Sequence, residues 1–267
     1  MEAFILLPFT QAKMSSNRIT KKEPNPFDTS KTAKAGEGRE KMIFQSPKGM
    51  DEFLKPTVLC DCDNNEIKKK ALELTQNAKS PKEGALGIFT FVRDQIPFAL
   101  DLPCTKASDT LKKAYGYCIT KTNLQVALMR AAGIPSRYHQ VVLHKNVLKG
   151  IMPSSIHKKV EEKIWYHPWC ECYLSEKWVA CDSYLDNSLY KAACRKGILT
   201  KDKLPTIDWN GDSDLRTATS WMLEDVGTHA SYDEVCKKVA DGIKIPKFLF
   251  KLMLKRSNSY TNKVRKK

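Results

Sequence analysis

The sequence predicts one large domain that mixes α-helices with a β-hairpin and carries tails. Apolar residues recur at helical spacing between about residues 67 and 132. Farther along, residues 165–174 and 178–183 alternate in the manner of strands and are separated by a tight turn. Between these regions, Cys118 stands where a loop becomes a helix. These three observations define the expected fold and its candidate nucleophile.

Three helices are expected in the first part of the folded region. An apolar stripe runs along residues 67–78. A second helix starts from a capping box at residues 80–83 and stops at Pro97. The third follows Cys118 and ends at Gly133, a residue type common just after a helix.

The second part of the chain is expected to supply the strands. A short strand candidate at 141–143 precedes a polar, basic segment at 144–163, interpreted as a loop or insertion. Residues 165–174 and 178–183 then form the expected hairpin. Another capping-box pattern opens a helix over 231–242.

Composition limits the class of protein. The chain has 267 residues, 42% of them apolar, which is enough to bury a core. Its net charge of +15 favours acidic surfaces, nucleic acid or anionic lipid as partners. The sequence contains no run of 18 apolar residues, so no membrane-spanning helix is predicted. The apolar segment at 4–9 is short and lacks the features of a secretory signal.

The cysteines favour a reducing environment. They number nine, an odd count, and are scattered along the chain. Without a convincing export signal, reduced thiols and a cytoplasmic location are expected.

Cys118 is the candidate nucleophile, because the first turn of a helix favours negative charge and hence a thiolate. A thiol nucleophile needs a base, and the base needs an orienting partner. His167 begins one strand of the hairpin and Asp182 ends the other, so the two are expected near each other at its open end. Cys118, His167 and Asp182 are therefore the candidate catalytic triad, with Asp186 as the nearest rival to Asp182.

Three blocks carry a resemblance to a known family. They read Gly-x-Cys followed by Leu-x-x-Ala-Leu-x-Arg-Ala-x-Gly-Ile-Pro-x-Arg, then His-x-Trp-x-Glu-x-Tyr-Leu, then Trp-Val-x-x-Asp. In this order and spacing they resemble the transglutaminase-like superfamily, more narrowly its small microbial members described as cysteine proteases. The resemblance covers roughly residues 79–183. Each block alone is a weak signal, and the three together are a strong one.

The resemblance implies an α+β fold with a papain-like core, in which the helix headed by the nucleophile packs on an antiparallel sheet. It also implies acyl chemistry: Cys118 attacks a carboxamide, a thioester forms, and water or an amine resolves it. His167 would accept the thiol proton and later protonate the leaving amine. The backbone N–H of Cys118 is the natural first oxyanion donor, and Gln95 is a guess for a side-chain donor. Neither a cofactor nor a metal is expected.

The chain is expected to divide into three parts. Composition and residue pattern predict a flexible arm at 1–50 and a basic amphipathic helix and tail at 244–267, and the resemblance implies a transglutaminase-like catalytic domain at 51–243 between them. Two features depart from the family pattern. Pro168 follows the histidine, although proline is tolerated at the start or edge of a strand. The basic insertion after Arg137 makes substrate choice individual to this chain.

Three functional interpretations stay open. The preferred one is a hydrolase, a cysteine protease or amidase on a peptide, protein or other amide substrate, because the chain lacks the extra β-domains of large cross-linking enzymes. The second is an acyltransferase that passes the acyl group to an amine. The third is a non-catalytic binding module, whose basic tail recruits an acidic partner or an anionic membrane. The basic excess lacks aromatic interleaving, which argues against nucleic acid.

Several residues also have purely structural interpretations. Cys118 can be core, His167 a satisfied structural histidine, and Asp182 a turn residue. The C-terminal helix can simply dock on the core with a solvated basic face. Core packing is favoured over zinc binding for Cys170, Cys172 and Cys181, and over a substrate cleft for Trp165, Trp169 and Trp178.

Overall fold

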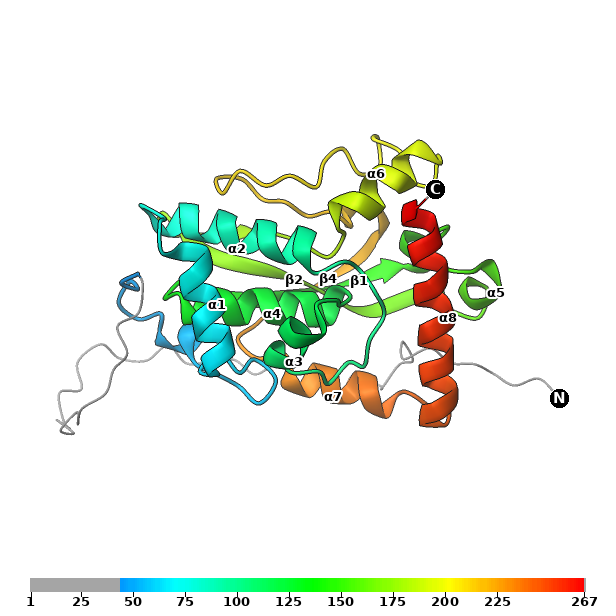
Figure 1. The fold of residues 1–267 in the computed structure, drawn as a ribbon, viewed down its shortest axis with the longest axis horizontal. Helices are drawn as coiled ribbons and strands as arrows, with labels where there is room; N and C mark the ends of the chain where they lie inside the picture. The colour runs from blue at the N-terminus through cyan, green and yellow to red at the C-terminus, as the bar shows by residue number, and fades with distance from the viewer. Residues whose placement is uncertain (1–43, 267) are drawn as a thin grey trace.

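The computed structural model describes residues 44–266 and confirms the expected α+β fold. Its four-stranded sheet has the order β3-β2-β1-β4, and all neighbouring strands are antiparallel. The helix α4 packs against β1 and β2, and α1, α2 and α3 pack around α4 (Figure 1). The strands are β1 (Ser136–His144), β2 (Lys163–Leu174), β3 (Lys177–Ala180) and β4 (Met222–His229).

The three helices expected in the first part of the chain are present. They are α1 (Asn65–Thr75), α2 (Pro81–Gln95) and α4 (Cys118–Ala131). The side chain of Ser80 accepts a hydrogen bond from the Glu83 N–H and caps α2, while Pro81 takes the first helical position, where no backbone donor is needed. Gly133 follows α4 with φ +86°, a left-handed conformation that suits glycine.

The hairpin of β2 and β3 has a defined register. Glu171 pairs with Ala180 and Leu174 with Lys177, so Ser175 and Glu176 form a two-residue turn. Both turn residues have positive φ, at 48° and 63°. Turns of this kind match the right-handed twist of the flanking strands. The ladder continues past β3, because the Cys181 N–H donates to the Cys170 carbonyl.

Several elements lie where no periodic pattern predicts them. β1 is longer than the expected 141–143, because polar residues such as His139 and Gln140 interrupt its apolar alternation. β4 is an edge strand with exposed or half-buried residues throughout, so it lacks a hydrophobic signature. The segment 144–163 contains structure rather than a plain loop. The further helices are α3 (Ala107–Lys113), α5 (Ser154–His157) and α6 (Asn187–Arg195), with single 3₁₀ turns at Asp51–Leu54, Lys145–Leu148 and Thr219–Trp221.

The chain then forms α7 (Asp233–Asp241) and α8 (Lys247–Lys266), which stands along one edge of the molecule (Figure 1). Four residues of α8 are buried: Phe250, Ser257, Thr261 and Val264. The Thr261 hydroxyl donates to the Ile151 carbonyl, and Asn258 makes two hydrogen bonds with the backbone of Leu100. The second half of α8 is therefore firmly docked.

Of the arm expected at 1–50, residues 1–43 lie outside the described part of the chain. Phe44 packs against the core, and its N–H donates to the Ala132 carbonyl at 3.0 Å. Within residues 44–266, no helix is long and apolar enough to cross a membrane.

Candidate active site

Cys118 is the first residue of α4, as expected, and close packing fixes the loop before it. The Tyr117 N–H donates to Thr120 Oγ1 at 3.1 Å, closing the first turn from within. A Cβ on Gly116 would lie 2.5 Å from the same Oγ1, so only glycine fits there without displacing Thr120. Tyr117 and Ile119 are buried, whereas Cys118 is partly exposed. The thiol is thus reachable on a rigid backbone.

His167 lies on β2, is only 3% exposed, and adjoins both other triad candidates. Its Nε2 is 3.7 Å from Asp182 Oδ2, an ion-pair distance. Burial opposes charge on the ring, but the neighbouring Asp182 and Cys118 together raise the pKa of His167 to about 10. Tyr184 packs edge-on against the ring, with centroids 5.3 Å apart. The raised pKa favours the imidazolium form of His167 at neutral pH.

Asp182 is 1% exposed and is oriented by residues that sequence reasoning missed. Thr217 donates to its Oδ2 twice, from the hydroxyl at 2.5 Å and from the backbone N–H at 3.3 Å. The Tyr184 N–H donates to Oδ1 at 3.2 Å. The rival, Asp186, instead caps α6 by accepting from the Leu189 N–H, and forms an ion pair with Arg265. The structure thus places Asp182, not Asp186, beside the imidazole.

Thr217→Val is expected to lower kcat by about tenfold, which corresponds to roughly 1.4 kcal/mol of one lost hydrogen bond. Valine keeps the volume but removes the hydroxyl that fixes the Asp182 carboxylate. The measurement is kcat together with the pH profile, whose His167-dependent limb should shift if Thr217 acts through Asp182. Thr217→Ser is expected to restore both quantities. Equal rates for the valine variant and the native chain would contradict this role.

A second charged cluster joins three strands of the sheet. His139 Nδ1 is 2.7 Å from Glu171 Oε1, and His139 Nε2 is 2.7 Å from Asp225 Oδ1. Glu171 also accepts from Arg137 Nε at 2.8 Å. The His139 ring stacks on Trp169, with centroids 4.6 Å apart. Burial lowers the pKa of His139, but the two carboxylates outweigh it and raise the pKa overall.

This cluster is expected to make stability depend on pH. The pKa of His139 in the folded state is raised above 6.5. Its contribution to the free energy of unfolding is therefore complete below pH 6.5 and is lost as the pH rises through the pKa of the folded state. Urea unfolding should show the native chain more stable than His139→Gln at about pH 6, with a smaller difference at about pH 9. His144→Gln, at an exposed pair with Glu162, is the control and should change stability little at either pH. A difference independent of pH would contradict this account.

The three hairpin cysteines pack in the core. Cys170, Cys172 and Cys181 are fully buried, and the Sγ atoms of Cys172 and Cys181 lie 3.9 Å apart. Gln125 Nε2 donates to the Cys181 carbonyl and binds this cluster to α4. No group of three His, Cys, Asp or Glu side chains that could hold a metal ion occurs within residues 44–266.

The tryptophans divide between burial and partial exposure. Trp169 is 1% exposed, under Arg216 and against His139. Trp178 is half-buried under the Arg137 guanidinium, which lies 4.0 Å from its ring centre. Trp165 is likewise half-buried, with the Lys163 ammonium over its ring. These partners are the protein's own side chains, which fits packing better than a substrate cleft.

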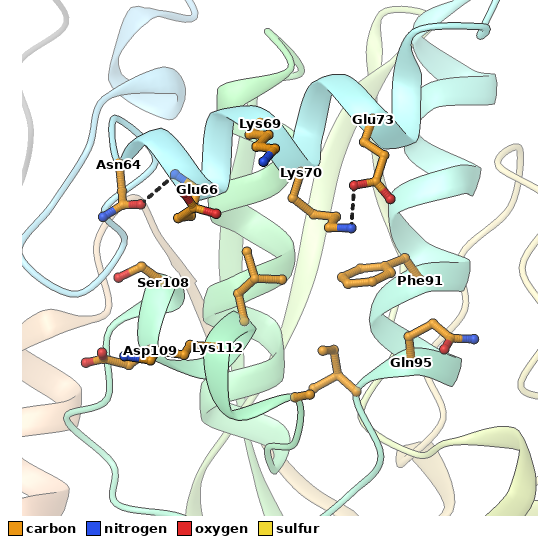
Figure 2. A pocket seen from close by; sticks show the side chains of 13 residues that line it. Asn64, Glu66, Lys69, Lys70, Glu73, Phe91, Gln95, Ser108, Asp109 and Lys112 are labelled. Carbon is orange, nitrogen blue, oxygen red and sulfur yellow. Dashed lines mark hydrogen bonds and ion pairs between the residues drawn. The ribbon is translucent and has the colours of Figure 1, made fainter.

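Gln95 lies on the wall of a pocket of about 790 Å³ formed by α1, α2 and α3 (Figure 2). None of the triad candidates lines this pocket, and Gln95 is exposed there. Among the residues that the structure describes, the buried Tyr232 hydroxyl has no hydrogen-bond partner. Burial raises the pKa of Tyr232, and Cys118 is among the neighbours that raise it further.

A cysteine at the start of a helix, beside a histidine and an aspartate on an antiparallel sheet, defines the papain-like class of folds. Residues 68–183 match the model of the transglutaminase-like superfamily. The match begins in α1 and ends just after Asp182, so it contains all three triad candidates.

Solved structures show more distant similarity. One is named a "Putative Cysteine Protease" from Cytophaga hutchinsonii, with 18% identity, a TM-score of 0.47, and coverage of 70% of this chain and 49% of that one. Another is named a "Putative Protease" from Parabacteroides distasonis, with 17% identity, a TM-score of 0.34, and coverage of 49% and 24%. The chain thus spans about half the length of the first. No curated protein matches it.

Proposed function

We propose that this protein is a thiol enzyme that cleaves amide bonds through Cys118, His167 and Asp182. The observation that carries the proposal is the placement of the buried His167 imidazole between Asp182 and Cys118, whose combined effect raises its pKa to about 10. A ring that stays protonated at neutral pH favours a thiolate beside it. The Cys118 sulfur is the partly exposed member of the three and is the one that a substrate can reach.

The chemical steps follow from this arrangement. The Cys118 thiolate attacks the carbonyl carbon of a carboxamide, and the oxyanion accepts a hydrogen bond from the Cys118 N–H at the start of α4. The C–N bond then breaks, and the His167 imidazolium gives its proton to the departing amine. Water attacks the thioester and passes a proton to His167. The carboxylic acid product leaves and Cys118 is regenerated.

Hydrolysis is the proposed outcome, with acyl transfer to an amine as the alternative. Hydrolysis needs only water at the thioester, whereas transfer also needs a site that holds the amine. The pocket described above cannot be that site directly, because no triad candidate lines it. Reaction in ¹⁸O-water with a labelled amine present separates the two: ¹⁸O in the product acid supports hydrolysis, and amine incorporation supports transfer.

We also propose that the protein works in the cytoplasm. All nine cysteines lie within the described residues, and all are free thiols. Cys172 and Cys181 are close in space yet unpaired. Retention of nine thiols favours a reducing compartment. Fractionation of the native cells would test this placement.

The test of the site compares the alkylation rates of individual cysteines with iodoacetamide, read by peptide mass spectrometry. Cys104 is exposed, whereas Cys118 is only partly exposed, so accessibility alone predicts that Cys104 reacts first. Partial desolvation and the carboxylates of Asp241 and Asp233 raise the pKa of Cys104. If Cys118 is the activated thiol, it is expected to react at least tenfold faster than Cys104 at mildly acidic pH.

His167→Ala is the control for this experiment. It removes the imidazolium without touching either thiol, so it should slow Cys118 and leave the Cys104 rate unchanged. If Cys118 reacts no faster than Cys104, or if His167→Ala leaves its rate unaltered, the chain is better described as a binding module with this fold.

A further inference from the structure

The first half of α8 carries exposed apolar side chains among basic ones. Phe248 is 70% exposed and Leu252 62% exposed, and their four-residue spacing places them on one face of the helix. Leu249 beside them is 42% exposed. Exposed large apolar side chains that gather on one face mark an interaction surface.

The charge of this surface has a single sign. Exposed basic residues flank the apolar pair: Lys247, Lys251, Lys255 and Arg256. The sequence contains no aspartate or glutamate after Asp241, so no acidic side chain of α8 itself neutralises them. The helix therefore presents an apolar strip bordered by positive charge.

The orientation of α8 is fixed by its other face. Phe250 is 3% exposed, and Thr261 and Val264 in the later turns are also buried. Lys196 Nζ donates to the Val264 carbonyl, and Arg265 forms an ion pair with Asp186. The helix cannot rotate to bury Phe248 and Leu252 without breaking these contacts. The apolar strip is thus held outward, and α8 itself runs along one edge of the molecule (Figure 1).

We propose that this face of α8, defined by Phe248, Leu252, Lys251 and Lys255, binds the surface of an anionic lipid bilayer. Aliphatic and aromatic side chains enter the boundary between headgroups and acyl chains, and the lysines reach anionic headgroups around them. Nucleic acid would use the charge but not the exposed apolar side chains. An acidic protein would use the charge too, and the experiment distinguishes it from lipid.

The test is flotation of the full chain with vesicles of phosphatidylcholine, with and without about one-third phosphatidylserine. The native protein is expected to float only with the anionic vesicles, and added salt should weaken the binding. Phe248→Ser/Leu252→Ser keeps the net charge and should lower the partition coefficient at least tenfold. Lys251→Glu/Lys255→Glu should lower it by a similar factor.

The matched control is Lys201→Glu/Lys203→Glu, which makes the same change of net charge at two exposed lysines elsewhere. It should reduce binding by less than threefold. Equal losses for the two glutamate pairs would overturn the proposal, since binding would then follow net charge alone. The absence of flotation by the native chain would overturn it, as would binding that Phe248→Ser/Leu252→Ser does not weaken. In the latter case an acidic protein becomes the better partner, which polyglutamate binding would report.

All substituted side chains are exposed, so the variants are expected to remain folded, and urea unfolding verifies this. The assay reads binding alone and requires no catalysis by Cys118. Its result is therefore independent of the proposed amide-cleaving activity.

Discussion

Replacing Cys118 by alanine is expected to lower amide cleavage by roughly 10⁵-fold, to the background that residual binding and the oxyanion site provide. The substitution removes the sulfur proposed to form the thioester but leaves the α4 backbone and the His167–Asp182 pair in place. The measurement is single-turnover cleavage of a peptide substrate, combined with mass spectrometry of the trapped acyl-enzyme. No covalent adduct should form at residue 118.

Cys104→Ala is the matched control, because Cys104 is more exposed and lies outside the triad. It should leave the rate within twofold of the native protein. Stability provides a second check: Cys118 is partly exposed, so alanine there should change the free energy of unfolding by less than about 1 kcal/mol. Cleavage by Cys118→Ala at more than a few per cent of the native rate would show that another group is the nucleophile.

Arg265→Ala is expected to destabilise the fold by about 3 kcal/mol, because it leaves the buried Asp186 carboxylate without its cationic partner. Burial opposes the charge on Asp186, yet the Arg265 guanidinium, 2.7 Å from its Oδ2, and the Ser188 hydroxyl hold the pKa of Asp186 at about 2. Arg265 also donates to the Phe98 carbonyl. Urea unfolding at neutral pH measures the loss.

The dependence on pH identifies the cause of this loss. A carboxylate with a depressed pKa contributes stability above its unfolded value of 3.8, and that contribution fades as the pH falls toward about 2. The difference between the native chain and Arg265→Ala should therefore narrow below about pH 4. Lys121 is expected to offset part of this loss of stability. Burial lowers the pKa of Lys121 to about 7, and Arg265 is among the groups that lower it. Removing Arg265 therefore favours a charged Lys121, which attracts the Asp186 carboxylate.

Arg256→Ala is the control for Arg265→Ala, because it removes an exposed arginine from the same helix. It should change the unfolding free energy by no more than about 0.5 kcal/mol. Equal losses in the two variants, or a loss that persists unchanged at low pH, would argue against the Asp186 ion pair as the cause.

The helices α1, α2 and α4 and the hairpin were predictable because their patterns are local. Asn64 and Ser80 cap α1 and α2 through hydrogen bonds within three residues, and such signals are visible in the sequence. The juxtaposition of His167 and Asp182 was also predictable, since hairpin pairing and strand alternation bring the two side chains to one end. The placement of Cys118 came from the resemblance of three blocks, because nothing local connects a helix start to a strand.

The remainder of the site depends on contacts between distant segments. Thr217 meets Asp182 across 35 positions of the sequence, from a loop without periodicity. Asp225 reaches His139 only because β4 pairs with β1, and β4 has no buried face to reveal it. Gln95 had the right chemistry for an oxyanion donor but lies on the pocket wall instead. Polar networks of this kind follow from tertiary packing, which sequence periodicity does not encode.

The two-residue turn at Ser175 and Glu176 sets the register of the hairpin, and this register positions His167, the proposed base, relative to Asp182. With Glu171 opposite Ala180, continuing the ladder places Tyr184 across from His167 and Asp182 one diagonal away. A shift of one residue in this pairing would send every later side chain of the second strand to the opposite face. Such a shift is therefore expected to abolish the proposed activity, with Cys118, His167 and Asp182 all left intact.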